Sequence, residues 1–127
     1  MKTIINSKNA PAPVGPYNQA ILAGNTLYVS GQIAIDPASG VIITESIEAE
    51  TEQVLNNLSA VLNEAGMNFE HIVKCSVFVT DMELFARINA IYARYFEGLE
   101  APARELVQVA ALPKYVNIEI SCIAVKN

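Results

Sequence analysis

The chain has 127 residues, of which 52% are hydrophobic and 17% charged, enough apolar material for a single domain to bury a core without disulfides or a metal. Eight Lys and Arg residues against thirteen Asp and Glu residues give a formal net charge of −5. This composition excludes an intrinsically disordered chain, and this charge argues against nucleic acid as the main partner, because nucleic-acid affinity comes from neutralising phosphates.

Cysteine and histidine are too scarce for most metal chemistry. His71 is the only histidine, and Cys75 and Cys122 each lie inside an alternating apolar run, where a reduced thiol packs as a small hydrophobic side chain. We therefore expect no metal site and two buried thiols in a cytoplasmic protein. No uncharged apolar run of about 18 residues is present, so we expect neither a membrane span nor export.

The first part of the chain predicts short strands. Residues 18–22 and 26–32 alternate or are rich in β-branched side chains, and residues 23–25 between them form a turn signal. The two segments are therefore expected to form a hairpin. Residues 36–40 predict a second turn.

The most regular helical pattern lies in residues 47–65, where hydrophobic residues recur with the spacing of one helix face. Ser46 is suited to the N-cap, and Gly66 is suited to the position just beyond the C-terminal end. Residues 71–80 then change to period two, which predicts a strand. Its two faces are expected to hold Val73, Cys75, Val77 and Val79 on one side and Lys74, Ser76, Phe78 and Thr80 on the other.

A second helix is predicted after Asp81, which can cap it, and its hydrophobic stripe continues to Phe96. Two further strands follow at residues 103–111 and 116–125, separated by residues 112–115. The expected order is β-β-β-α-β-α-β-β. Right-handed crossovers would place both helices on one face of the sheet and leave the other face open.

Alternation assigns the last two strands to these faces. The helix side is expected to hold Val107, Val109, Val116, Ile118, Ile120 and Cys122, and the open side Arg104, Leu106, Gln108, Asn117, Glu119, Ser121 and Ile123. An open face that carries Phe78, Leu106 and Ile123 is too apolar to be left in water. We therefore expect self-association to bury it.

This open face would also bring a cation and a carboxylate together. If residues 112–115 close an antiparallel hairpin, Glu119 lies about opposite Gln108, with Arg104 a few residues along. The pattern fits a structural ion pair between Arg104 and Glu119 as well as it fits a functional site. As a site, Arg104 offers a planar fork that binds a carboxylate through two hydrogen bonds, and Glu119 can orient or deprotonate a water.

Two further residues leave their roles open on the pattern alone. Tyr17 follows Gly15-Pro16 in a turn-rich segment, where its ring would serve equally well as a core anchor or as the wall of a pocket. Asn89 lies one position outside the stripe of the second helix, where a solvated side chain is the default interpretation.

Several separated segments together form a specific pattern. They are Gly15-Pro16-Tyr17-Asn18-Gln19-Ala20, Val29-Ser30-Gly31-Gln32-Ile33, the strand from Val73 to Val79 with Asp81, Asn89-Ala90 with Tyr92, Pro102-Ala103-Arg104, and Ala111-Leu112-Pro113-Lys114 leading to Ile118-Glu119-Ile120. On these segments, and over nearly its whole length, the chain resembles the reactive intermediate deaminase (RidA; YjgF/YER057c/UK114) family.

The resemblance implies a chorismate-mutase-like α+β subunit, with one mostly antiparallel sheet and two helices on one face. It also implies a homotrimer whose ligand clefts lie between neighbouring subunits. Similar family members are hydrolases of amino-acid metabolism that convert reactive 2-enamine and 2-imine acids, such as 2-iminobutanoate and 2-iminopropanoate, to 2-keto acids and ammonia. They use no cofactor. By position, Arg104 resembles the residue that binds the substrate carboxylate and Glu119 the residue that positions the attacking water or assists proton transfer. The remaining implied cleft residues are Tyr17, Ser30, Gly31, Phe85, Asn89 and Leu106.

The chain departs from the family pattern at two positions. Leu106 replaces a cysteine common two residues after the Arg, although its backbone groups can still contact a ligand, and Ser121 replaces an acidic residue. Both departures favour an alternative, a non-catalytic protein that binds a 2-keto or amino acid in the same clefts. A ribonuclease role, sometimes attached to relatives, is disfavoured by the acidic charge and by the lack of a basic or aromatic stacking surface.

Overall fold

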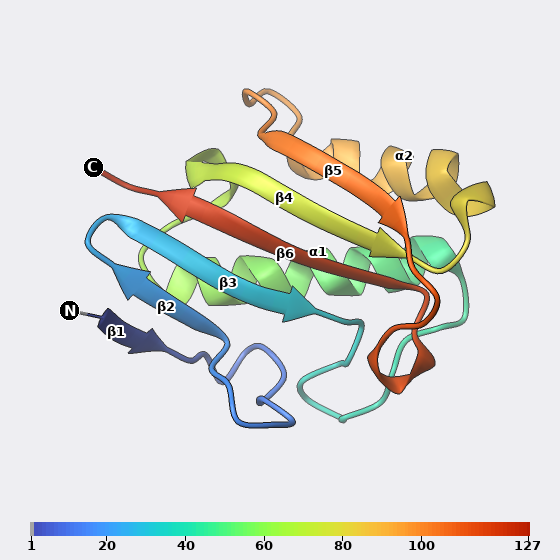
Figure 1. Ribbon diagram of the computed structural model, residues 1–127, viewed down its shortest axis with the longest axis horizontal. Helices are drawn as coiled ribbons and strands as arrows, with labels where there is room; N and C mark the ends of the chain where they lie inside the picture. The colour runs from blue at the N-terminus through green and yellow to red at the C-terminus, as the bar shows by residue number, and fades with distance from the viewer. Residues whose placement is uncertain (1) are drawn as a thin grey trace.

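A computed structural model describes residues 2–127, which form one six-stranded sheet with two α-helices packed on one of its faces (Figure 1). The elements in chain order are β1 (Lys2–Ile5), β2 (Ala20–Ala23), β3 (Thr26–Gln32), α1 (Ile47–Glu64), β4 (Ile72–Val79), α2 (Phe85–Tyr95), β5 (Ala103–Gln108) and β6 (Ile118–Val125). The predicted element order and the α+β class are confirmed. The sequence pattern does not locate β1, which is short and mostly exposed.

The strands lie in the order β1-β2-β3-β6-β4-β5, and every neighbouring pair is antiparallel except β4 and β5. The predicted hairpin of β2 and β3 is confirmed, with Ala23 opposite Thr26 and Gly24 in the left-handed conformation that its turn requires. Helix α1 connects β3 to β4, and α2 connects β4 to β5. Two parallel crossovers thus place both helices on the same face.

Residues 112–115 do not close a hairpin, so the condition under which Glu119 would lie opposite Gln108 is not met. Because β5 is parallel to β4 through the α2 crossover, the chain must cross from the sheet edge to its middle, where β6 inserts between β3 and β4. Glu119 therefore lies opposite Phe78 of β4, and not opposite Gln108.

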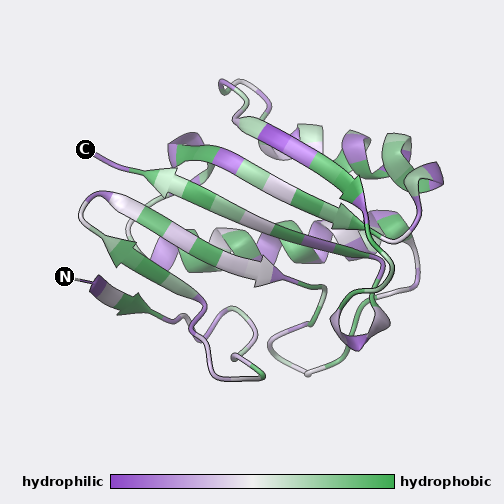
Figure 2. Cartoon of the chain, viewed as in Figure 1, coloured by the Kyte–Doolittle hydropathy of each residue, from purple (hydrophilic) through white to green (hydrophobic). Residues whose placement is uncertain are grey.

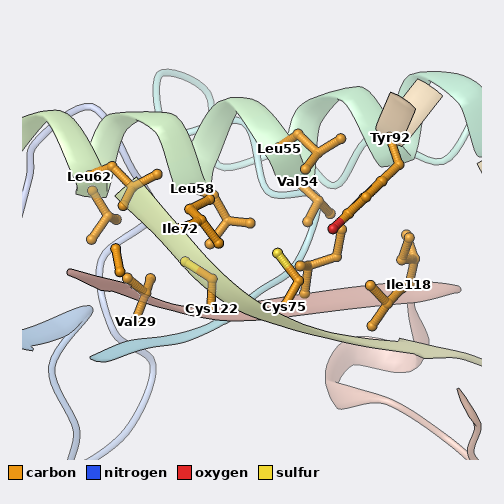
Figure 3. Packing of buried hydrophobic residues seen from close by; sticks show 14 of the residues in the cluster. Val29, Val54, Leu55, Leu58, Leu62, Ile72, Cys75, Tyr92, Ile118 and Cys122 are labelled. Atoms are coloured by element: carbon orange, nitrogen blue, oxygen red, sulfur yellow. The ribbon is translucent and has the colours of Figure 1, made fainter. Parts of the chain in front are cut away.

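The core lies between the sheet and the helices. Alternate residues of β4 and β6 are buried on the helix side, as predicted for β6. Helix α1 contributes Val61 together with Val54, Leu55, Leu58 and Leu62, of which the last four are labelled in Figure 3. Each such side chain stabilises the fold by about 1.5–3 kcal/mol when fully buried. Val73 is the exception to the predicted face, because the β4–β6 register shifts between Ile72 and Lys74 and leaves Val73 exposed.

The predicted faces of β5 are reversed. Arg104 is paired with Cys75 and Leu106 with Val77, and residues paired in a ladder point to the same side of a sheet. Arg104 and Leu106 therefore face the helix layer, whereas Val107 is paired with Phe78 and is exposed on the open face. A shift of one residue in alternation exchanges every side chain between the two faces, and the partner strand of β5 is β4 and not β6.

The helix ends agree with the predicted signals. The Ser46 side chain accepts a hydrogen bond from the Ala49 N–H at the start of α1, and Gly66 follows the helix with a positive φ of 72°. Asp81 caps a short 3-10 turn, Met82–Leu84, which leads directly into α2. Within the described chain, neither helix is long and apolar enough to cross a membrane.

Hydrophobic and hydrophilic residues are interspersed along the strands of the sheet (Figure 2), and the face away from the helices carries both kinds. Tyr28 and Val107 are exposed there, and Lys74 Nζ lies 3.0 Å from a Glu105 carboxylate oxygen. Surface ion pairs of this kind contribute little to stability, because solvent screens the two charges. The open face is therefore a surface of mixed polarity, and neither α-helix of residues 2–127 covers it.

Candidate functional site

The predicted site residues fall into two clusters. The Glu119 cluster consists of Tyr17, Ser30, Gly31 and Glu119, which line one pocket of about 380 Å³. Most other lining side chains are apolar and come from residues 11–14, residues 33–35 and Pro113. The pocket thus combines one carboxylate with mostly apolar walls.

Gln19 builds the wall formed by the N-terminal segment. Its buried side-chain amide donates hydrogen bonds to the carbonyls of Ser7 at 3.0 Å and Pro11 at 2.8 Å, and its oxygen accepts one from the Ser7 N–H at 2.6 Å. Sequence reasoning missed this role, although a glutamine inside the Gly15–Ala20 block is a signal for it. One buried amide side chain therefore fixes residues 7–11 beside the pocket that Pro11 and Gln19 help to line.

Tyr17 forms a wall of the pocket. Its side chain is 46% exposed, and its hydroxyl accepts a hydrogen bond from the Val14 N–H at 3.3 Å. Ser30 is held nearby, because its hydroxyl donates to the Asn18 carbonyl at 2.7 Å. Of the two interpretations of Tyr17 that the sequence left open, the structure therefore supports the pocket wall.

Gly31 permits the close approach of the Glu119 side chain to β3. A Cβ atom at Gly31 would lie 2.6 Å from Glu119 Cδ and 2.9 Å from Cγ, both too close for any real contact. The β3–β6 register is irregular between Val29 and Gln32, which brings the backbone of β3 against the carboxylate. Burial raises the pKa of Glu119 above its usual 4.5.

A buried carboxylate on α1 fixes the start of β6. Glu50 is fully buried and accepts hydrogen bonds from the Asn117 backbone N–H at 2.8 Å, from its side-chain amide at 2.8 Å and from the Ile118 N–H at 3.2 Å. Sequence reasoning missed this residue. The signal was available, because Glu50 falls three residues after Ile47 on the face predicted to be buried.

The Arg104 cluster consists of Arg104 on β5 and Phe85, Asn89 and Tyr92 on α2. Arg104 Nη1 donates a hydrogen bond to Asn89 Oδ1 at 2.9 Å, and the guanidinium carbon lies 4.7 Å from the Tyr92 ring centroid and 5.9 Å from that of Phe85. Arg104, Asn89 and Tyr92 line a recess of about 460 Å³. Asn89 is therefore half-buried against the Arg, and the default interpretation of a solvated residue is wrong.

The structure does not bring the two clusters together within one chain. Arg104 points to the helix side of the edge strand, whereas Glu119 lies on the open side of a central strand, and they line different pockets. The prediction that both share the open face is wrong for Arg104. Leu106, the remaining candidate, packs its side chain against the core, so that only its backbone is available at the sheet edge.

The cysteines and the histidine lie outside both clusters. Cys75 and Cys122 are free and buried, as predicted, and burial raises the pKa of both thiols. His71 Nδ1 accepts a hydrogen bond from the Asn68 N–H at 3.0 Å in a short capped turn. Within residues 2–127, no group of three or more His, Cys, Asp or Glu side chains is arranged to hold a metal ion.

The chain is similar to known proteins in both sequence and fold. Residues 7–126 match the family described as endoribonuclease L-PSP. A RutC family protein of Synechocystis is 54% identical over 96% of this chain and 95% of its own length. The Rattus norvegicus 2-iminobutanoate/2-iminopropanoate deaminase is 44% identical over 100% of this chain and 92% of its own length. The crystal structure of Escherichia coli TdcF with bound serine is 38% identical, with a TM-score of 0.95 over 98% of this chain and 99% of that one.

Proposed function

The chain belongs to the reactive intermediate deaminase family, whose chorismate-mutase-like fold it shares, and on this premise we propose that it hydrolyses 2-imino acids to 2-keto acids and ammonia. The observation that carries the proposal is the Glu119 carboxylate, which lies half-buried in a pocket with mostly apolar walls. A general base needs a site of this kind, where burial brings its pKa closer to neutral pH.

The proposed reaction needs positioning and one proton acceptor. Arg104 binds the substrate carboxylate, and Glu119 takes a proton from water as the water oxygen attacks C2 of the imine. Glu119 gives this proton to the nitrogen as the C=N π bond opens, which forms a tetrahedral amino alcohol. Glu119 then accepts the proton of the new hydroxyl group as the C=O bond forms, and delivers it to the nitrogen as the C–N bond breaks. The products are a 2-keto acid and ammonia. This sequence consumes one water and requires no cofactor.

The two clusters cannot serve one small substrate from within the same chain, because they lie on different faces of the sheet. We propose that residues 1–127 form one domain that assembles as a cytoplasmic homotrimer, in which the Arg104 cluster of one subunit meets the Glu119 cluster of its neighbour. The exposed Tyr28 and Val107 on the open face support self-association. Tyr17, Ser30, Gly31, Phe85 and the Leu106 backbone would complete the cleft.

The test is a coupled assay in which a threonine dehydratase generates the imine and lactate dehydrogenase consumes the keto acid. Arg104→Lys keeps the charge but loses the planar fork, and we expect kcat/KM to fall about 10- to 100-fold. Glu119→Gln keeps the shape and removes the base, and we expect kcat to fall. Near wild-type hydrolysis by Arg104→Lys contradicts the role of Arg104, and an unchanged kcat in Glu119→Gln contradicts water activation.

A second candidate is a protein that binds a 2-keto or amino acid without turning it over. Leu106 and Ser121 favour it, because they stand where many relatives carry a thiol and an acidic group, and the TdcF relative holds a bound serine. The same assay separates the two candidates. Binding of 2-ketobutyrate to the purified protein, with no acceleration of keto-acid release, supports this second candidate.

A ribonuclease activity, suggested by the family description, has less support from this chain. The formal net charge is −5, and neither cluster combines a basic groove with stacked aromatic rings. RNA cleavage that persists in Arg104→Lys and Glu119→Gln preparations would be assigned to a contaminant.

A further inference from the structure

The Arg104 guanidinium is held from two directions by α2. Asn89 Oδ1 accepts a hydrogen bond from Nη1 at 2.9 Å, and the central carbon of the guanidinium lies over the ring of Tyr92, 4.7 Å from the ring centroid. A cation within about 6 Å of an aromatic centroid is attracted to the ring face. Within residues 2–127, Nε and Nη2 of Arg104 have no hydrogen-bond acceptor. One edge of the fork is therefore left free.

Tyr92 is a rigid platform for this contact. Its side chain is 6% exposed, packs against Phe96 with ring centroids 4.8 Å apart, and extends from α2 into the core toward the strands (Figure 3). Its hydroxyl is buried beside the Cys75 thiol without an oxygen or nitrogen partner in the described chain. A buried hydroxyl in that state costs about 1–3 kcal/mol. The stabilising part of Tyr92 is thus its ring.

The same helix shows what a free Nε–Nη2 edge can bind. Two residues before Asn89, Arg87 Nε donates to Glu48 Oε2 at 2.8 Å and Nη2 donates to Oε1 at 2.7 Å. This bidentate contact lowers the pKa of Glu48 to about 2. In Arg104 the corresponding edge carries the same two donors and no carboxylate of the described chain. Its geometry suits a carboxylate supplied from outside the chain.

We propose that Tyr92 and Asn89 are positioning residues, which hold the Arg104 guanidinium so that its Nε–Nη2 edge binds the substrate carboxylate side-on. Tyr92 fixes the plane of the guanidinium, and Asn89 fixes its rotation by occupying Nη1. The inference rests on the proposed function, because it takes Arg104 as the carboxylate-binding group. In this arrangement Asn89 contacts Arg104 and does not contact the substrate.

The direct test follows the arginine Nε–H signals in a ¹H–¹⁵N NMR spectrum during titration with 2-ketobutyrate. The chain has arginines at positions 87, 94 and 104, and the signal lost in Arg104→Lys identifies Arg104. We expect this signal to shift on saturation, while the Arg87 signal, already engaged by Glu48, stays in place. Saturable binding that leaves the Arg104 Nε–H signal unmoved overturns the proposal.

Variants of Tyr92 separate positioning from folding. Tyr92→Leu removes the platform, and we expect KM for the imine and Kd for 2-ketobutyrate to rise at least about tenfold with little change in kcat, since a carboxylate contact is present in both ground and transition states. Tyr92→Phe keeps the ring and should restore both values. A folded Tyr92→Leu variant with wild-type KM and Kd overturns the proposal.

The matched control is Phe69→Leu, which makes the same aromatic-to-leucine change in the adjoining cluster. Phe69 packs against Tyr95 and Phe96 but not against Arg104. It should lower stability and leave Kd unchanged, and an equal loss of affinity would overturn the assignment to Tyr92. If Tyr92→Leu does not fold, Asn89→Ala provides the test, with a rise in Kd expected. Failure of the wild-type protein to accelerate imine hydrolysis, with 2-ketobutyrate still bound at Arg104, would instead overturn the proposed function and leave this proposal standing.

Discussion

The Glu119 and Arg104 clusters differ in what holds the charged group. Glu119 lies on β6, a central strand with β3 and β4 on either side, and its start is fixed by the buried carboxylate of Glu50. Arg104 lies on the edge strand β5, which has only β4 as a neighbour, and its side chain is oriented by contacts with α2. Backbone and burial therefore position the proposed base, whereas side-chain contacts position the proposed carboxylate-binding group.

This comparison predicts different kinds of sensitivity. Substitutions around Glu119 should change the free energy of unfolding or kcat, because they displace a strand or the carboxylate itself. Substitutions around Arg104 should change affinity first, because β5 and α2 can keep their packing while the guanidinium loses its orientation.

Gly31→Ala should have the largest effect, on kcat. The new Cβ would overlap the Glu119 carboxylate and displace it, and a displacement of about 1 Å costs about 100-fold in rate. The coupled imine-hydrolysis assay measures it. Gly24→Ala is the control, since Gly24 has a positive φ of 61° and no atom within 4 Å of the added Cβ. It should cost stability alone, and an undiminished kcat in Gly31→Ala would contradict the proposed geometry.

Glu50→Gln should lower the free energy of unfolding by about 2 kcal/mol. The amide that replaces the carboxylate faces three donors with one acceptor oxygen and an NH₂ group, so at least one buried N–H loses its partner. Urea unfolding at a fixed protein concentration measures the change. Glu64→Gln, on the exposed face of the same helix, should lie within about 0.5 kcal/mol of wild type. Equal stabilities of the two variants would show that Glu50 does not fix β6.

The raised pKa of Glu119 should appear in the pH profile. Its base role requires the ionised form, so kcat should fall as pH drops through a pKa above the usual 4.5. The contribution of Glu119 to folding stability changes with pH in the opposite direction to kcat. A raised pKa favours the neutral carboxyl in the fold, so this contribution is present below the unfolded pKa and is lost as pH rises through the folded one. Glu119→Gln should abolish the acid limb, and a limb that persists in that variant would assign it to another group.

Tyr92→Phe should have the smallest effect, a gain in stability of about 1 kcal/mol. The substitution removes a buried hydroxyl that has no oxygen or nitrogen partner in the described residues and keeps the ring against Arg104. Thermal unfolding measures it. A loss greater than about 2 kcal/mol would show that the hydroxyl makes a stabilising contact with the Cys75 thiol.

The same contrast explains which predictions from the sequence succeeded. Alternation in β6 was sufficient, because a central strand packed against helices has every second residue buried, from Val116 to Cys122. Alternation in β5 was not sufficient. Of residues 104–107, one face holds Arg104 and Leu106 and the other holds Glu105 and Val107, so each face has one charged and one apolar side chain. Only the pairing partner decides between them, and the parallel crossover through α2 set that partner as β4.

The features of the site also divide into those that the sequence predicted and those that it did not. The positions of Arg104 and Glu119 in the chain were clear from their surrounding segments, but their placement on different faces was not, because it depends on long-range strand order. Glu50 and Gln19 were missed for another reason. A buried polar residue is visible in a sequence only as an exception to a hydrophobic stripe, and its partners at Asn117 and Ser7 lie far away along the chain.

The central claim is that one cleft takes Arg104 from one subunit and Glu119 from its neighbour, and mixed assemblies test it most directly. Arg104→Lys and Glu119→Gln subunits, differently tagged and equally mixed, are purified as hybrids and assayed for imine hydrolysis. In a purified hybrid trimer of either composition, one of the three clefts has an intact Arg104 and an intact Glu119, so about a third of wild-type activity should return. Hybrids with no more activity than either parent variant would contradict the claim.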